Sequence, residues 1–155
     1  MIPVRLVLAD DHEIMRVGLR SLLEGQINWS VVGEAIDGEE AVEMVLSLKP
    51  DVALLDIAMP KISGLEAARQ ILLQVPRTKI LLLSAHDSTQ VIADVLDSGA
   101  KGYVLKSDAA RDLVAAVQAL YSNHTFFTPK VADLVLSRHM KRVQDQADRH
   151  KKDIK

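Results

Sequence analysis

The sequence predicts an α/β fold in which helices cover both faces of a doubly wound, five-stranded parallel sheet. Five short apolar runs alternate with five segments of helical periodicity between residues 4 and 121. Apolar runs without an alternating pattern are typical of strands that are buried on both faces, as in parallel sheets. Strict alternation of strand and helix favours right-handed crossovers, which place helices on both faces of one sheet.

The five predicted strands are short apolar segments with polar residues at their ends. They are expected at residues 4–9, 30–36, 52–56, 79–84 and 102–105. The third segment, VALLD, ends in Asp56, although it reads as a fully buried strand. A buried carboxylate without partners costs several kcal/mol, so Asp56 should have compensating groups nearby.

Each predicted strand is followed by apolar residues at spacings of three and four, which indicate an amphipathic helix. Gly25 and Gly99 are expected to cap the first and fourth helices. Pro50 and Pro76 are expected to stop the second and third. The segment DGEE, which starts at Asp37, has the spacing of a capping box. The predicted buried faces are formed by Met15, Leu19, Leu22, Leu23, Ala41, Val45, Leu48, Leu65, Ala68, Leu72, Val75, Ile92, Val95, Leu96, Leu113, Val117 and Leu120.

Composition excludes several classes of protein. The chain has no cysteine, which excludes disulfides and cysteine metal sites. No apolar run approaches the ~20 residues that span a bilayer, and the N-terminus lacks a signal-peptide cleavage pattern, so a cytoplasmic protein without membrane contacts is expected. The net charge of −2 divides into +4 on residues 138–155 and −6 on the rest. The acidic body argues against nucleic-acid binding, and the basic tail has no aromatic residue for base stacking.

Polar residues stand at the carboxyl ends of four predicted strands. Asp10 and Asp11 follow the first, Asp56 ends the third, Ser84 ends the fourth and Lys106 follows the fifth. Ligands of such sheets bind beyond the carboxyl ends of the strands, so these groups are expected to converge. Clustered carboxylates call for a cation, and a hard ion such as Mg²⁺ suits oxygen ligands. Together with an amine and a hydroxyl, they would hold a phosphoryl group against a carboxylate nucleophile.

These residues resemble the receiver domain of two-component response regulators. The similarity lies in Asp10-Asp11, LLDIAMPKISGLE around Asp56, LLLSAH, and GAKGYVLK ending at Lys106, and it runs from about residue 3 to residue 121. The ADDH opening, the Lys-Ser pair and NHTFFTPKVADLVL resemble the NarL/FixJ (LuxR-type) transcription regulators. The resemblance implies a flavodoxin-like (βα)5 receiver with strand order 2-1-3-4-5 at residues 1–122, and a linker helix at 123–155.

The resemblance also implies a role for each residue of the site. A sensor histidine kinase would donate a phosphoryl group to Asp56, with Mg²⁺ bound nearby. The domain would be a signalling module that assists its own phosphotransfer and dephosphorylation, not an enzyme with a separate substrate. The implied roles are Mg²⁺ ligation by Asp11, Asp56, the Ala58 carbonyl and, through water, Asp10; phosphoryl binding by Ser84 and Lys106; and an aromatic switch at Tyr103.

Some positions depart from the family pattern. Ser107 stands where many receivers have proline, often after a cis peptide bond, which costs about 3–4 kcal/mol without proline. Ala58 and His86 occupy positions that tune phosphoryl lifetime in this family.

Two further residues near the site have structural expectations. Gly64 is expected to adopt a conformation closed to other residues as the third helix begins. His12 is predicted to be an early helix residue without a ligand role.

Two other functions are compatible with an α/β fold. A haloacid-dehalogenase-like phosphatase would carry its nucleophile in an Asp-x-Asp motif after the first strand, whereas this chain has adjacent acids there and alanine at position 58. A flavodoxin-like FMN binder needs a loop rich in Ser, Thr and Gly after the first strand, but DDHEI is acidic. The combination of motifs therefore favours the receiver.

The C-terminal segment carries a helical stripe of Ala132, Leu136, Met140, Val143 and Ala147. Regulators of this subfamily usually continue into a helix-turn-helix domain, so DNA binding would need an output domain that this chain lacks. A piece of a longer regulator is favoured over a natural single-domain regulator. The stripe is expected either to pair with a second copy in a homodimer or to pack on its own receiver. DQADRHKKDIK beyond it is expected to fray.

Overall fold

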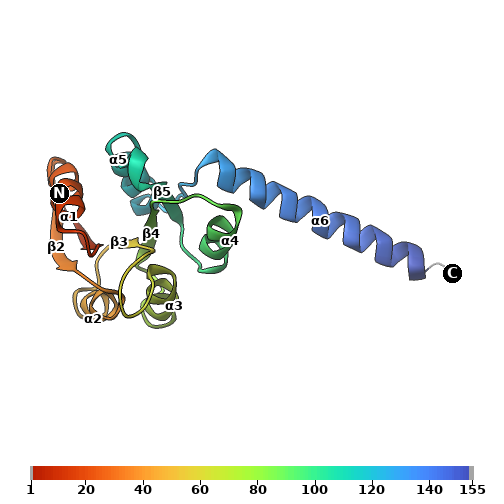
Figure 1. Ribbon diagram of the computed structural model, residues 1–155, viewed down its shortest axis with the longest axis horizontal. Coiled ribbons are helices and arrows are strands. Elements are labelled where there is room, and N and C mark those ends of the chain that lie inside the picture. Colours follow the sequence, from red (N-terminus) through yellow and green to blue (C-terminus); the bar gives the residue numbers. More distant parts are fainter. Residues whose placement is uncertain (1, 154–155) are drawn as a thin grey trace.

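The sheet has the predicted topology. The computed structural model describes residues 2–153, and its five strands form one parallel sheet in the order β2-β1-β3-β4-β5 (Figure 1). The strands are β1 (Val4–Ala9), β2 (Trp29–Ala35), β3 (Val52–Asp56), β4 (Lys79–Ser84) and β5 (Gly102–Leu105). β2 begins and ends one residue earlier than predicted, and Ile36 beyond it is half exposed.

Helices cover both faces of this sheet, as the alternating pattern predicts. α1 (Glu13–Glu24) and α5 (Ala109–Tyr121) pack on one face, and α2 (Gly38–Leu48), α3 (Gly64–Gln74) and α4 (Thr89–Asp97) on the other (Figure 1). A short 3-10 helix, η1 (Lys106–Asp108), joins β5 to α5. Side chains of β3 divide between the two cores, because successive residues of a strand point to opposite faces. β3 is therefore buried along its whole length, up to Asp56.

The core between the sheet and α2, α3 and α4 is called the second core. Short polar side chains precede these three helices. Asp37 accepts a hydrogen bond from the Glu40 N–H, which confirms the predicted cap of α2. Ser63 and Ser88 cap α3 and α4 in the same way. α1 ends at Gly25 as predicted, although Gly25 has a right-handed φ of −69°. Gly99 follows the end of α4 with a φ of 86°.

Gly64 is required for a different reason from the predicted one. Its φ is not in the left-handed region; Lys61 in the same loop takes that conformation, with a φ of 69°. A Cβ atom on Gly64 would instead lie 2.2 Å from the backbone oxygen of Asp56. The start of α3 therefore packs directly against the backbone of Asp56, and only glycine leaves room for it.

The segment after α5 returns to the sheet before the last helix begins. Phe126 forms an isolated parallel β-bridge with Gly102, the first residue of β5. The Tyr103 N–H donates to the Phe126 carbonyl at 2.9 Å. α6 (Pro129–Asp153) then runs as one continuous helix that projects away from the sheet (Figure 1). The expected fraying is therefore not found up to Asp153. No helix in residues 2–153 is both long and apolar enough to span a membrane.

Candidate functional site

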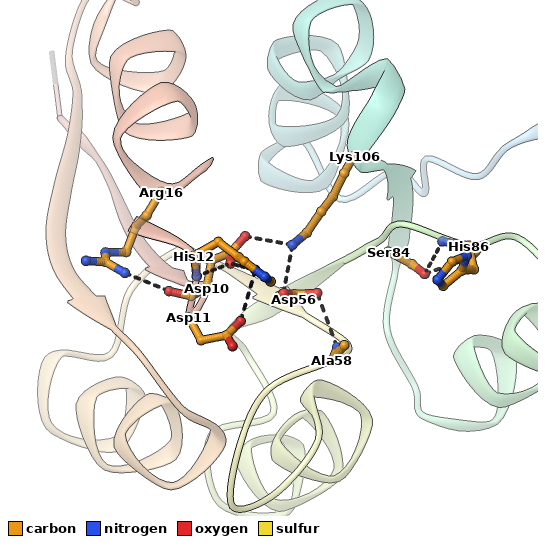
Figure 2. Close-up of polar contacts among 9 residues, drawn as sticks. All are labelled: Asp10, Asp11, His12, Arg16, Asp56, Ala58, Ser84, His86 and Lys106. Carbon is orange, nitrogen blue, oxygen red and sulfur yellow. Dashed lines mark hydrogen bonds and ion pairs between the residues drawn. The ribbon is translucent and has the colours of Figure 1, made fainter. Parts of the chain in front are cut away.

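The carboxyl edge of the sheet brings together the acids that the sequence places at the strand ends. Asp10 follows β1 directly and is fully buried, and Asp56 is the last residue of β3 with 1% of its surface exposed. β1 and β3 are neighbours in the sheet, so their carboxyl ends lie side by side. Lys106 reaches the same point from the end of β5, as Figure 2 shows.

Lys106 bridges the two buried carboxylates. Its Nζ atom lies 2.8 Å from Asp56 Oδ2 and 3.0 Å from Asp10 Oδ2. The Asp56 contact is a hydrogen bond, and its lysine side chain is only 11% exposed. One cation thus compensates two buried anions, which leaves the centre of the site one negative charge in excess before Asp11 is considered.

Burial and charge shift the pKa values of this pair. Burial raises the pKa of Asp56 above its usual value, and the nearby Asp10 charge adds to this, although Lys106 opposes both. Burial by itself would lower the pKa of Lys106, but its hydrogen bond to Asp56, its close contact with Asp10 and the charges of both acids outweigh burial, so that pKa is raised. Lys106 therefore remains a cation in the site.

The acidic cluster fits a hard divalent cation. Asp10, Asp11, His12 and Asp56 each offer one ligand atom, and these atoms lie within 4.8 Å of one another. Asp10 Oδ2 is buried and has no hydrogen-bond partner among the described residues, since its contact with Lys106 is an ion pair without hydrogen-bond alignment. An excess of carboxylate oxygens, one of them without a hydrogen bond, matches the oxygen-rich coordination that Mg²⁺ prefers.

The loop after β3 holds the Asp56 side chain in place. The Ala58 N–H donates to Asp56 Oδ1 at 3.2 Å, while Oδ2 faces Lys106. The two oxygens of Asp56 are thus oriented by two different partners.

The backbone at Lys106–Ser107 has a regular conformation: η1 begins here, and no peptide bond within residues 2–153 is cis. The proline missing at position 107 therefore leaves a trans backbone.

Ser84 and Tyr103 meet at one backbone carbonyl, that of His86. The Ser84 hydroxyl donates to the His86 oxygen at 2.6 Å and accepts from the His86 N–H at 3.0 Å. The Tyr103 hydroxyl donates to the same oxygen at 2.7 Å, and its ring is fully buried. Figure 2 shows Ser84 bound to His86, with no drawn contact to Asp56 or Lys106. Ser84 therefore lies at the predicted edge, but its hydroxyl is bonded to the loop after β4.

Two residues near the acids were not assigned a site role from the sequence. His12 begins α1 as predicted, yet its Nδ1 atom lies 3.2 Å from both Asp10 Oδ1 and Asp11 Oδ1. Arg16, one turn later, donates to the Asp10 carbonyl at 2.8 Å and pairs with Glu34. Their adjacency to the acidic pair, at helical spacing, is the only signal in the sequence.

Comparison with known proteins places this site in a family. The sequence model of the response regulator receiver domain matches residues 6–118. The transcriptional regulatory protein DegU of Brevibacillus brevis is 37% identical over 92% of this chain and 60% of its own length. This chain thus spans well under two thirds of that relative.

Solved structures agree with this match. A LuxR-family two-component response regulator from Aurantimonas sp. SI85-9A1 is 31% identical with a TM-score of 0.81, over 89% of this chain and 99% of that one. The isolated receiver domain of RcsB from Salmonella enterica serovar Typhimurium, solved with the phosphomimetic BeF3−, is 30% identical with a TM-score of 0.77, over 85% and 98% of the two chains. Sequence, fold and site therefore agree that this chain belongs to the response regulator receiver domain family, in its NarL/FixJ (LuxR-type) branch.

Proposed function

We propose that Asp56 accepts a phosphoryl group from a phosphohistidine of a sensor histidine kinase, and that this modification switches the domain. The observation that carries the proposal is the setting of Asp56: a buried carboxylate held by Lys106 at 2.8 Å and flanked by further acids. Protein carboxylates are weak nucleophiles in water, but one that is oriented, desolvated and paired with a cation suits attack on phosphorus.

The residues present fit Mg²⁺, which would neutralise the charge that develops on the transferred group. We assign its side-chain ligands to Asp11 and Asp56, a backbone ligand to the Ala58 carbonyl, and a water-mediated contact to Asp10. Asp10 is the most buried of the acids and already faces Lys106, which is consistent with an outer contact. Asp11 is partly exposed, with 29% of its side chain open to solvent.

In the transfer step, an Asp56 carboxylate oxygen attacks phosphorus, and the bond between phosphorus and the donor's imidazole nitrogen breaks. The imidazole leaves with the bonding electron pair and takes up a proton, so the step balances. Lys106 holds one phosphoryl oxygen by its charge, and the Ser84 hydroxyl donates to another. Hydrolysis of the acyl phosphate then resets the domain, with Ala58 and His86 beside the path of the water.

The shared carbonyl of His86 suggests how the switch works. To reach a phosphoryl group, the Ser84 hydroxyl must leave both of its bonds to His86. The loop after β4 then depends on Tyr103 alone for that contact. Phosphorylation would thus shift a two-state element, the β4–α4 loop with its buried tyrosine, by changing one local charge.

An apolar hollow beside the site fits a docking surface for the kinase. It has a volume of about 620 Å³ and lies between α1 and α5, next to Lys106. Ile14, which lines it, is 90% exposed, so its side chain is open to a partner. An apolar helix face of the phosphodonor would seat here and present its imidazole to Asp56. Such a partner implies a cytoplasmic setting.

We further propose that the domain controls transcription through an output domain, because the DegU relative is named as a transcriptional regulator and is longer than this chain. Residues 1–122 would be the receiver and 123–155 the linker to that domain. DNA contacts would belong to the output domain, since the receiver body is acidic.

Intact-protein mass spectrometry after incubation with acetyl phosphate tests the proposal. One added phosphoryl group is expected in the presence of Mg²⁺, and none after chelation or in Asp56→Asn. Asp145→Asn, an exposed acid on α6, is the matched control and should be modified normally. An adduct that persists in Asp56→Asn would contradict the proposal. If no donor labels the chain and BeF3− does not bind in the presence of Mg²⁺, a phosphoacceptor function is excluded.

A further inference from the structure

Most of α6 has no contact with the rest of the molecule. Its first turns dock on the receiver, where Val131 is fully buried, Leu134 packs on the second core and Arg138 pairs with Asp97 of α4 at 3.2 Å. From His139 to His150 every side chain is exposed. An isolated helix of this length is marginal in water, because its stability normally comes from packing of one face.

The predicted apolar stripe faces solvent. Val131, Leu134 and Arg138 form the side that docks on the receiver, whereas Leu136 and Met140 are 60% exposed and Val143 is 48% exposed. The alternative in which the stripe packs on its own receiver is therefore wrong. Neither α4 nor any other described element covers this face.

The spacing of the stripe is that of a coiled coil. Leu136, Met140, Val143 and Ala147 follow one another at intervals of four, three and four, which is the heptad spacing of alternating d and a positions. Ala132, the first residue of the predicted stripe, falls outside this register. We call Leu136, Met140, Val143 and Ala147 the seam. In this register Val131 and Leu134 occupy outer f and b positions, so the receiver docks on the side away from the seam.

Charges along the seam are segregated in a way that suits pairing with an identical helix. Before the seam, the same register places Asp133 at an a position and Lys130 at an e position, so pairing is confined to residues 136–147. The flanking e and g positions of the seam are uncharged polar residues or histidine: Ser137, His139, Gln144 and Gln146. All charged residues between Arg138 and Arg149 fall on the outer b, c and f positions: Arg138, Lys141, Arg142, Asp145, Asp148 and Arg149. Two copies of one helix always bring their own flanks together, so fixed charges there would repel unless balanced. Here none is present.

We propose that α6 is a self-association helix, through which two copies of this chain pair along the seam. A different protein partner would be selected by charges at the flanking positions, and these are absent. The docked receivers do not obstruct the pairing, because they lie on the outer sides of the two helices. The seam is short, about two heptads, so the dimer is weak and forms with rising protein concentration. This inference does not depend on phosphoryl transfer.

Sedimentation equilibrium of the 155-residue chain, from about 5 μM to about 1 mM without a phosphodonor, tests the proposal. A monomer–dimer equilibrium is expected. Met140→Glu should raise the dissociation constant at least about tenfold, because each dimer would bury two carboxylates in the seam. The matched control is Val135→Glu, a half-exposed apolar residue of the same helix that lies outside the seam and outside the receiver core. It should change the constant by less than about twofold.

A second variant separates lost pairing from a lost helix. His139→Lys with Gln144→Lys keeps the seam intact but sets like charges against each other across the flanks, in parallel or antiparallel pairs alike. Dimerisation should weaken at low salt and recover at about 0.5 M salt, because salt screens exposed charges. A chain that stays monomeric throughout overturns the proposal. So does a dimer that tolerates Met140→Glu, responds equally to Val135→Glu, or ignores the paired lysines at low salt.

Discussion

At the scale of single residues, the charge of Lys106 offsets the free-energy cost of burying the carboxylates of Asp10 and Asp56. Its ammonium lies within 3.0 Å of two buried carboxylates, and no other lysine or arginine among the described side chains forms an ion pair with either of them. Removing one partner of a buried ion pair leaves an uncompensated charge, which costs more than the pair contributes. Lys106 is therefore a structural counter-ion, in addition to the phosphoryl-binding role proposed for it.

We expect Lys106→Met to lower the free energy of unfolding by about 3 kcal/mol in Mg²⁺-free buffer at pH 8, as measured by urea denaturation. Methionine fills a similar volume, so the loss reports charge rather than a cavity. Adding Asp10→Asn to Lys106→Met should recover part of the loss, because one of the unpaired charges disappears. A double variant no more stable than Lys106→Met would show that charge imbalance is not the cause.

Ionisation of the buried Tyr103 hydroxyl is expected to lower the stability of the fold at alkaline pH. Burial raises the pKa of this phenol; Ser84 lowers it by less than burial raises it, and the charge of Asp87 adds a smaller rise. The folded-state pKa lies above that of the unfolded chain, so the stabilising contribution is complete below about pH 10 and is lost as pH rises through the folded-state pKa.

The urea midpoint of the wild type should consequently fall more steeply between about pH 9.5 and 11 than that of Tyr103→Phe, which cannot ionise at this position. At pH 8, Tyr103→Phe should lose about 1 kcal/mol, because the hydrogen bond to the His86 carbonyl is gone. Parallel pH profiles for the two proteins would contradict the assignment of a raised pKa.

At the scale of secondary-structure elements, the contact between α3 and β3 fixes how the loop after Asp56 leaves the site. Gly64 starts α3 against the Asp56 carbonyl, and its own N–H donates to the Ile57 carbonyl at 2.9 Å. These two contacts hold the two ends of the loop from Ile57 to Ser63 close together. Any side chain at position 64 would push the helix away from the strand that carries Asp56.

We expect Gly64→Ala to destabilise the domain by about 2–3 kcal/mol and to slow phosphorylation by acetyl phosphate, because its Cβ atom would overlap the Asp56 backbone. Gly18→Ala is the control. Gly18 lies in α1 with open space around it, so alanine should stabilise the protein by about 0.5–1 kcal/mol through helix propensity. Thermal unfolding and mass-spectrometric time courses of both variants measure these effects. Equal behaviour of the two would refute the close-packing argument.

At the scale of the whole molecule, the proposed cation site would couple folding to cation binding through its excess of acidic groups. In the unfolded chain Asp56 is far from the adjacent pair Asp10 and Asp11, whereas folding brings their ligand atoms within 4.8 Å of one another. A cation that binds only the folded cluster stabilises it by mass action. If the proposed Mg²⁺ site is correct, the repulsion among these acids costs the free protein some stability, which the bound cation would restore.

Mg²⁺ at tenfold its dissociation constant should therefore stabilise the fold by about 1.4 kcal/mol and raise the melting temperature by about 3–6 °C. Calorimetry with Mg²⁺, and again after chelation, measures the shift. Asp11→Asn should melt at or above the wild-type temperature without Mg²⁺, since one repulsive charge is gone, and should respond less to the metal. An equal shift from NaCl of the same ionic strength would assign the effect to general screening.

The fold class, and the residues that gather at the carboxyl edge of the sheet, could be predicted from the sequence. Five apolar runs separated by amphipathic periods leave few topologies open, because each run must be buried and each helix must cover it. Asp10, Asp11, Asp56 and Lys106 stand at strand ends, and parallel strands bring those ends to one edge. Local patterns sufficed here because burial and strand direction are encoded locally.

The contacts made across the fold could not be predicted from the sequence and are known from the three-dimensional structure. Lys106 bridges acids from two other strands, Ser84 binds the His86 backbone, and Gly64 is needed for a close approach rather than for a left-handed turn. The direction of the α6 stripe was likewise open, since periodicity identifies an apolar face but not what covers it. Distances between residues far apart in sequence depend on how whole elements pack, and a single sequence carries that information only in the sum of all its contacts.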